Sequence, residues 1–285
     1  MVDETYRTHK KVGVAFTGAG LRGLANLALI ELFEEVDFKP DFLIGCSGGA
    51  AIAGLWAQGL SSSDILIRLD QQLRKDVIRG IDLYSFLFFY KKPRGSYKKE
   101  HALLKVNKLY KLYKNLFNDT RLEDLLFPTA VQATDIETGA SMVFEQGLLK
   151  DIVYASSAML PFLPPKCIDN KWYADGSFSS PMPIMEMVTR GMDHIISFSF
   201  MEQAFTHPKD FLSYYSNFVS LAFTKAQRTQ VTFAIEFHHG ETLLLPVKTH
   251  MESGIFSRRE IEHMIEGGRQ TVRQYRDEIL RLIKR

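Results

Sequence analysis

The chain has 285 residues, 46% of them hydrophobic, which is ordinary for a globular protein with a sizeable core. Its formal net charge of +2 gives no global case for binding nucleic acid, and no uninterrupted apolar run approaches the roughly 20 residues of a membrane-spanning helix. Cys46 and Cys167 are too few for a disulfide scaffold and the first ten residues lack the apolar core of a secretory signal, so we expect a cytoplasmic protein.

The first part of the chain is predicted to alternate strand, loop and helix. Lys11 to Phe16 is a β-prone run, followed by a glycine loop at 17–23 and by apolar residues at helical spacing from Leu24 to about Asp37. A second apolar run, Phe42 to Ile44, leads into Gly45-Cys46-Ser47-Gly48-Gly49 and a small-residue helical pattern. Gly-x-Ser-x-Gly between a strand and a helix is typical of a nucleophile elbow, a strained turn that exposes the serine hydroxyl.

The composition changes after a helix predicted from Ser61 to about Lys75. Residues 83–90 are densely aromatic, and five Lys and Arg residues follow between positions 91 and 99. An amphipathic helix over 103–117 then places apolar residues on one face and lysines away from it. Aromatic residues beside lysines suit a surface for anionic lipid, but an ordinary helical insertion with a core-facing apolar stripe gives the same pattern and is slightly favoured.

The remaining elements continue the alternation. The pattern predicts a short helix at 122–126, strands at 130–135 and 141–144, a buried helix start and rigid bend at 155–165, a strand at 172–174, a helix at 184–189, a strand at 194–200, helices at 211–230 and 261–284, and an edge strand at 241–247. This alternation indicates an α/β fold with a mainly parallel central sheet flanked by helices. Functional residues collect at the carboxyl ends of such strands, where we expect both Ser47 and Asp175.

The glycine loop has two interpretations. Gly18-x-Gly20-x-x-Gly23 matches the dinucleotide-binding fingerprint, but that motif needs an acidic residue where the second strand ends, and here Asp41 stands at its beginning. An oxidoreductase is therefore the disfavoured alternative. The same loop can serve as an anion cradle, because N–H groups around Gly20 and Leu21 at the head of a helix could donate to an oxyanion formed at Ser47. Arg22 would add positive potential there, or lie solvated in the first helical turn.

A serine nucleophile needs a neighbouring base. Asp175 follows an aromatic strand in an Asp-Gly pair and is free to approach the elbow, although Asp-Gly is more often a plain turn. A Ser-acid-His triad would add a histidine from the set His207, His238, His239, His250 and His263. None of these sits in a recognisable turn, and the best of them, His238-His239, is more readily a structural pair.

Four motifs together resemble the patatin-like phospholipases in their order and spacing. They are Gly18 to Gly23, Gly45 to Gly49, Ala155 to Ala158 with the prolines after it, and Asp175 to Ser177 with Pro183 after it. The resemblance covers about residues 11–200 and implies a patatin-like three-layer sandwich and a serine lipid acyl hydrolase that needs no metal or cofactor. It also implies roles for particular residues: Ser47 as nucleophile, Asp175 as base, and Gly18, Ala19, Gly20 and Leu21 as oxyanion hole.

Three residues depart from the family pattern, and none removes a reacting group. Ala19 stands where a second glycine is frequent, Asn26 where a histidine is common, and Ser177 where a glycine is usual, which would matter if that position needs a positive φ.

We expect a single domain over residues 1–285, with a helical insertion at about 77–120 and a C-terminal helical extension at about 205–285. The expected partner is a phospholipid or other acyl-ester lipid, cleaved by a phospholipase A, lysophospholipase or carboxylesterase reaction, with peripheral contact to anionic membranes. The segments Phe86 to Phe89 and Tyr110 to Phe117 could line an acyl-chain groove. A catalytically silent membrane-binding protein is the main alternative.

Overall fold

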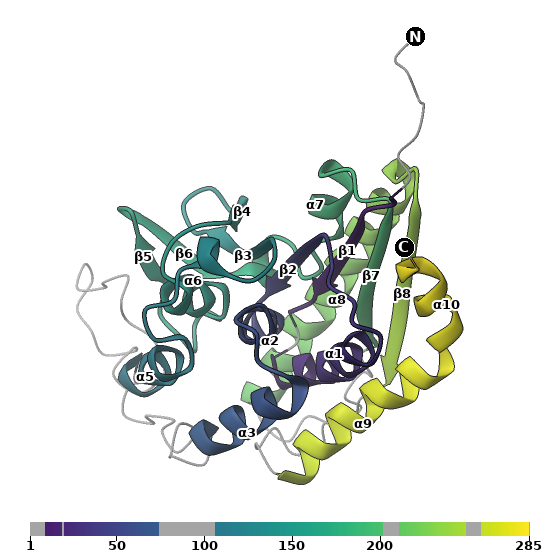
Figure 1. Cartoon of the computed structure of the whole chain (residues 1–285). Helices are drawn as coiled ribbons and strands as arrows, with labels where there is room; N and C mark the ends of the chain where they lie inside the picture. The colour runs from purple at the N-terminus through teal and green to yellow at the C-terminus, as the bar shows by residue number, and fades with distance from the viewer. Residues whose placement is uncertain (1–8, 19, 74–105, 202–210, 249–257, 285) are drawn as a thin grey trace, which may run out of the picture.

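A single mixed sheet organises the chain in the computed structural model, which describes residues 9–18, 20–73, 106–201, 211–248 and 258–284 (Figure 1). The strands are β1 (Val12–Phe16), β2 (Phe42–Cys46), β3 (Thr129–Asp135), β4 (Ser141–Phe144), β5 (Lys166–Ile168), β6 (Lys171–Asp175), β7 (His194–Met201) and β8 (Glu241–Lys248). They lie in the order β5-β6-β3-β2-β1-β7-β8, and β4 pairs with β3. The pairs from β3 through β2, β1 and β7 to β8 are parallel, while β4, β5 and β6 pair antiparallel. The predicted α/β fold with a mainly parallel sheet is confirmed.

Helices cover both faces of this sheet and form a three-layer sandwich. They are α1 (Asn26–Glu35), α2 (Gly48–Ala57), α3 (Ser62–Leu73), α5 (Val106–Phe117), α6 (Leu149–Ser156), α7 (Ile184–Thr189), α8 (Phe211–Phe237), α9 (Arg258–Gln274) and α10 (Arg276–Ile283). Figure 1 shows α1, α2 and α9 on one face and α8 on the other. Alternation along β1 matches this arrangement: Val12, Val14 and Phe16 join the larger core, while Ala15 packs with Met187 of α7 and Ala234 of α8 on the opposite face.

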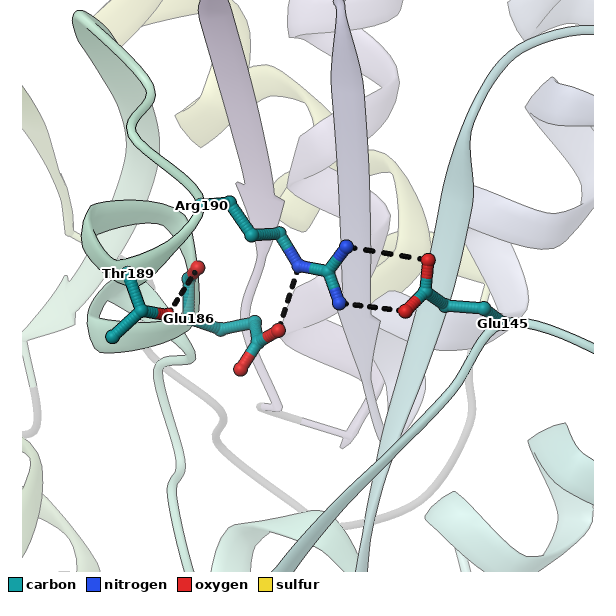
Figure 2. A network of polar contacts seen from close by, with 4 residues as sticks. All are labelled: Glu145, Glu186, Thr189 and Arg190. Atoms are coloured by element: carbon teal, nitrogen blue, oxygen red, sulfur yellow. Dashed lines mark hydrogen bonds and ion pairs between the residues drawn. The ribbon is translucent and has the colours of Figure 1, made fainter.

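A polar network fixes α7 beside the antiparallel end of the sheet (Figure 2). Arg190, which follows α7, donates to Glu186 Oε1 at 2.6 Å and to both carboxylate oxygens of Glu145 at 3.2 and 2.7 Å. Its guanidinium also lies over the Phe42 ring of β2, 4.2 Å from the ring centroid. The C-terminal end of α7 is therefore held to both β2 and the end of β4.

Several helix boundaries differ from the predicted ones. A 3₁₀-helix at Gly20–Ala25 precedes α1, and α8 extends to Phe237. The predicted closing helix is interrupted at Tyr275, which separates α9 from α10. The segment 155–158 ends α6 instead of starting a helix, and the prolines that follow it are typical of the region just beyond a helix C-terminus. The short strand β5 was not predicted, because three residues are too few to show a period.

Much of the predicted aromatic and basic insertion lies outside the described residues, including 83–90 and 91–99. In the part of α5 that is described, Tyr113 and Phe117 are buried while Lys111 and Lys114 are exposed. The core interpretation of this face is confirmed at these positions. Among the helices that the structure describes, none is long and apolar enough to cross a lipid bilayer.

Candidate active site

Ser47 occupies the sharp turn between β2 and α2. Its φ of 49° and ψ of −123° are unusual for a residue with a side chain, and such backbone costs on the order of 1–3 kcal/mol. The flanking glycines make the turn possible, because a Cβ on Gly45 would collide with the backbone of Ala50 and one on Gly49 with the carbonyl of Phe16. The serine is 7% exposed and directly precedes the N-terminus of α2, where negative charge is stabilised.

The Ser47 hydroxyl donates a hydrogen bond of 2.6 Å to Asp175 Oδ2. Strand β3 brings the two residues together, since Gln132 pairs with Cys46 on one side and Ala133 pairs with Asp175 on the other. Asp175 therefore lies at the carboxyl end of β6, which runs antiparallel to β3. The expectation that Asp175 lies at the carboxyl end of a strand is confirmed, and that strand is one of the antiparallel ones in the mainly parallel sheet.

Burial dominates the electrostatics of Asp175. The carboxyl is 1% exposed, and desolvation raises its pKa from 3.8 to about 6, against the hydrogen bonds from Ser47 and Ser177 that favour the charged form. The Ser177 N–H donates to Asp175 Oδ1 at 2.8 Å, and Ser177 is not among the residues with positive φ. Serine therefore fits the position where the family usually has glycine.

The segment Ser156 to Ala158 holds the main chain of both residues of the pair. The Ser47 N–H donates to Ser156 Oγ at 2.8 Å, and that hydroxyl donates to the Gln132 carbonyl at 2.6 Å. The Asp175 N–H donates to the Ala158 carbonyl at 3.1 Å. The sequence marked this segment as small residues before a bend, and only the packing of α6 against β3 and β6 reveals its contacts with the site.

Ser156→Ala is expected to slow acylation of Ser47 by about tenfold and to lower the free energy of unfolding by about 2 kcal/mol, since it leaves a buried N–H and a buried carbonyl without partners. The rate of reaction with a fluorophosphonate and urea denaturation measure the two effects. Ser62→Ala is the matched control, because Ser62 is also buried and hydrogen bonds to Glu34 Oε2 at 2.7 Å, away from the elbow. It should cost stability without slowing acylation, and equal slowing in both variants would contradict a positioning role for Ser156.

The glycine loop lies against the elbow. A Cβ on Gly18 would stand 3.2 Å from Ser47 Cβ, and the Gly18 N–H donates to the Pro181 carbonyl at 3.1 Å, so this N–H is already engaged. Gly20 has a φ of 56° and faces open space, and its carbonyl contacts Gly48. Leu21 packs partly against the core and Arg22 is half-buried in the 3₁₀-helix. Ala19 lies outside the described residues.

The other predicted candidates lie elsewhere. Asp41 accepts the Val12 N–H at 2.8 Å at the beginning of β2. His238 hydrogen bonds through both ring nitrogens, to Thr242 Oγ1 and to the Met192 carbonyl, each at 2.8 Å. His239 and His263 are exposed, and His207 and His250 lie outside the described residues.

Burial raises the pKa of the Cys46 thiol well above its ordinary value, so the thiol stays neutral. In the described part of the chain, no group of three His, Cys, Asp or Glu side chains could hold a metal ion.

Comparisons with known proteins agree with this geometry. The chain is 26% identical over 186 residues to Lysophospholipase NTE1 of Candida glabrata, covering 65% of this chain and 10% of that protein. It is 26% identical over 188 residues to Lysophospholipase nte1 of Emericella nidulans, covering 66% of this chain and 12% of the relative. This chain thus spans about a tenth of the length of these relatives.

The crystal structure of VipD from Legionella pneumophila shares the fold. The two superimpose with a TM-score of 0.56 at 14% identity, over 94% of this chain and 67% of VipD. The family model of the patatin-like phospholipases matches residues 14–188, which include the elbow, the glycine loop and Asp175. The chain therefore belongs to the patatin-like phospholipase family.

Proposed function

We propose that this protein hydrolyses acyl esters of lipids with Ser47 as nucleophile and Asp175 as general base. The observation that carries the proposal is the hydrogen bond of 2.6 Å between the two side chains at a strained elbow. Family membership and the lysophospholipase names of the relatives support a phospholipid, a lysophospholipid or a related carboxylic ester as substrate.

The reaction proceeds in two steps through an acyl-enzyme. Asp175 Oδ2 takes the hydroxyl proton as Ser47 Oγ attacks the ester carbonyl, and the protonated aspartate then gives the proton to the departing alcohol. Water enters, loses a proton to the same carboxylate and attacks the acyl carbon. Ser47 leaves with that proton, the free acid departs, and both side chains return to their starting state.

Backbone N–H groups of the glycine loop stabilise the oxyanion of each tetrahedral intermediate. We assign this role to Gly20 and Leu21, because the family resemblance places the oxyanion hole in this loop and the loop lies against the elbow at Gly48. Gly18 acts by lacking a side chain, which lets the loop approach Ser47, while its N–H serves Pro181. Ala19 remains a predicted donor, and Arg22 adds positive potential at the head of the 3₁₀-helix.

We also propose that residues 1–285 form one catalytic domain. Beyond the family match, β8 extends the same sheet by pairing with β7. Helix α9 packs on α1, where Arg269 makes two hydrogen bonds of 2.8 and 2.6 Å to Glu31. A Cβ on Gly268 would also collide with the Ala25 carbonyl, so α9 lies close against the 3₁₀-helix that carries the loop.

A fluorophosphonate probe tests the proposed nucleophile. Mass spectrometry of the treated protein should place one adduct on Ser47, and the adduct should disappear in Ser47→Ala. The neutral thiol of Cys46 should carry none. Folded wild-type protein that fails to react with the probe would overturn the proposal.

A further inference from the structure

Helix α8 extends past the sheet at the edge that carries Ser47. Its 27 residues span about 40 Å, whereas the eight residues of β7 span about 26 Å. The C-terminal end of α8 lies near the start of β7, where His238 contacts the Met192 carbonyl. Toward the other end, the Phe223 ring meets the Phe178 ring edge-to-face at 5.3 Å. The middle of α8 therefore packs beside the loop that follows Asp175, and the N-terminal half of the helix extends beyond this contact.

One face of this half-helix is apolar and exposed. Tyr214, Phe218 and Leu221 recur at helical spacing and are 57%, 63% and 39% exposed. The same stripe continues with Lys225 and Arg228, both exposed. The sequence from Phe211 to Ile235 contains no Asp or Glu. We call these five residues the α8 surface.

Charge decides which partner fits the α8 surface. Aromatic side chains beside basic ones suit the boundary between acyl chains and anionic headgroups, where the rings insert and the cations pair with phosphate. A second copy of the chain docked through the same surface would bury Lys225 and Arg228 with no acidic residue on either stripe to pair with them. A lipid surface is therefore the better occupant.

The face of α8 opposite the α8 surface contacts the loop that follows Asp175. Phe178 is 41% exposed, ends the 3₁₀-helix Gly176–Phe178 that follows Asp175, and touches Phe223 of α8. Gln230 of α8 donates to the Ser179 carbonyl at 2.6 Å and fixes the helix to the same loop. These contacts anchor α8 beside the candidate active site and leave the α8 surface facing away from the sheet.

We propose that the α8 surface docks the protein on anionic lipid bilayers. The purpose of the docking rests on the proposed function, because that function supplies a lipid substrate. The docking itself can be measured without catalysis. Binding combines insertion of Tyr214 and Phe218 with the attraction of Lys225 and Arg228 to headgroups, so added salt weakens it.

Vesicle co-sedimentation of the Ser47→Ala protein tests the proposal, because this variant leaves the lipid intact. Vesicles of phosphatidylcholine with phosphatidylglycerol should bind it, and vesicles of phosphatidylcholine alone should bind it at least tenfold more weakly. Adding Tyr214→Ser and Phe218→Ser should lower binding to the anionic vesicles at least tenfold. The matched control adds Phe233→Ser and Phe237→Ser, which lie on the same helix at 53% and 62% exposure but at its far end. This control should bind as the parent does.

Hydrolysis separates the two proposals. In the protein that retains Ser47, the double substitution Tyr214→Ser and Phe218→Ser should reduce the turnover of vesicle lipid. It should leave the turnover of a short soluble ester unchanged. Equal loss of vesicle binding in both double variants, or none in either, would overturn the docking surface. A concentration-dependent dimer abolished by Tyr214→Ser and Phe218→Ser, with vesicle binding unchanged, would also overturn it. Failure of fluorophosphonate labelling, with vesicle binding as expected, would overturn the hydrolase alone.

Discussion

Asp175→Asn is expected to lower the rate of ester hydrolysis by about 10³-fold, in the middle of the range for a lost general base. The amide keeps the size of the carboxyl but cannot take the proton from Ser47 Oγ, which now lies 2.6 Å from Oδ2. The rate of fluorophosphonate reaction should fall with it, since both reactions need an activated serine. Steady-state hydrolysis of a soluble ester and the labelling rate measure the loss.

The same substitution is expected to stabilise the fold. A loss of activity in this variant therefore cannot come from unfolding. A pKa of about 6 against an ordinary value of 3.8 means that holding the buried charge at neutral pH costs about 3 kcal/mol. Urea denaturation should therefore show a gain of about 1–3 kcal/mol in the free energy of unfolding. Asp193→Asn is the control, because Asp193 accepts the Lys11 N–H at the opposite end of the sheet. That variant should retain activity, and an Asp175→Asn protein that is less stable than wild type would contradict the assigned environment.

The elbow could be predicted from sequence because its determinants are local. Gly45 and Gly49 are required by contacts within the turn and with the neighbouring strand β1, and these contacts recur wherever a strand turns directly into a helix on a parallel sheet. The apolar runs that alternate with helical patterns predicted β1, β2 and β7, because this signal is also local. Each of these strands is short and buried on both faces, so its sequence reads as an apolar run. The pairing of Asp175 with Ser47 rested on the family resemblance, and the hydrogen bond between them agrees with it.

Contacts that depend on strand register could not be predicted. Ser156 reaches the Ser47 N–H only because α6 packs against β3, and the direction of β6 follows from its pairing with Ala133 to Asp135. Neither contact produces a periodic pattern in a single sequence, so neither could be predicted from it. The engagement of the Gly18 N–H by Pro181 is likewise a contact between segments more than 160 positions apart in the sequence.

The rate of acylation is expected to fall about tenfold per pH unit below pH 6, and about 100-fold by pH 4. The free protein needs Asp175 ionised to accept the proton, and its pKa is about 6. Measuring kcat/KM for a soluble ester between pH 4 and pH 8 gives the pKa of the free protein directly. A profile that stays flat down to pH 4 would mean that Asp175 is not the base.

The contribution of Asp175 to the free energy of unfolding should fall as the pH rises from 4 to 6, whereas the rate of acylation should rise. Because the folded-state pKa of Asp175 lies above its unfolded value of 3.8, the folded protein binds more protons between about pH 4 and pH 6, and this group lowers the free energy of unfolding as pH rises. Other carboxyls such as Asp135, whose pKa is lowered by the Glu137 N–H, act in the reverse sense. Comparing wild type with Asp175→Asn isolates the one group: the two proteins should be nearly equal in stability at pH 4 and separate by about 1–3 kcal/mol by pH 7. A gap that does not change with pH would show that the carboxyl is not held in a desolvated site, and the acid side of the rate profile would then need another group.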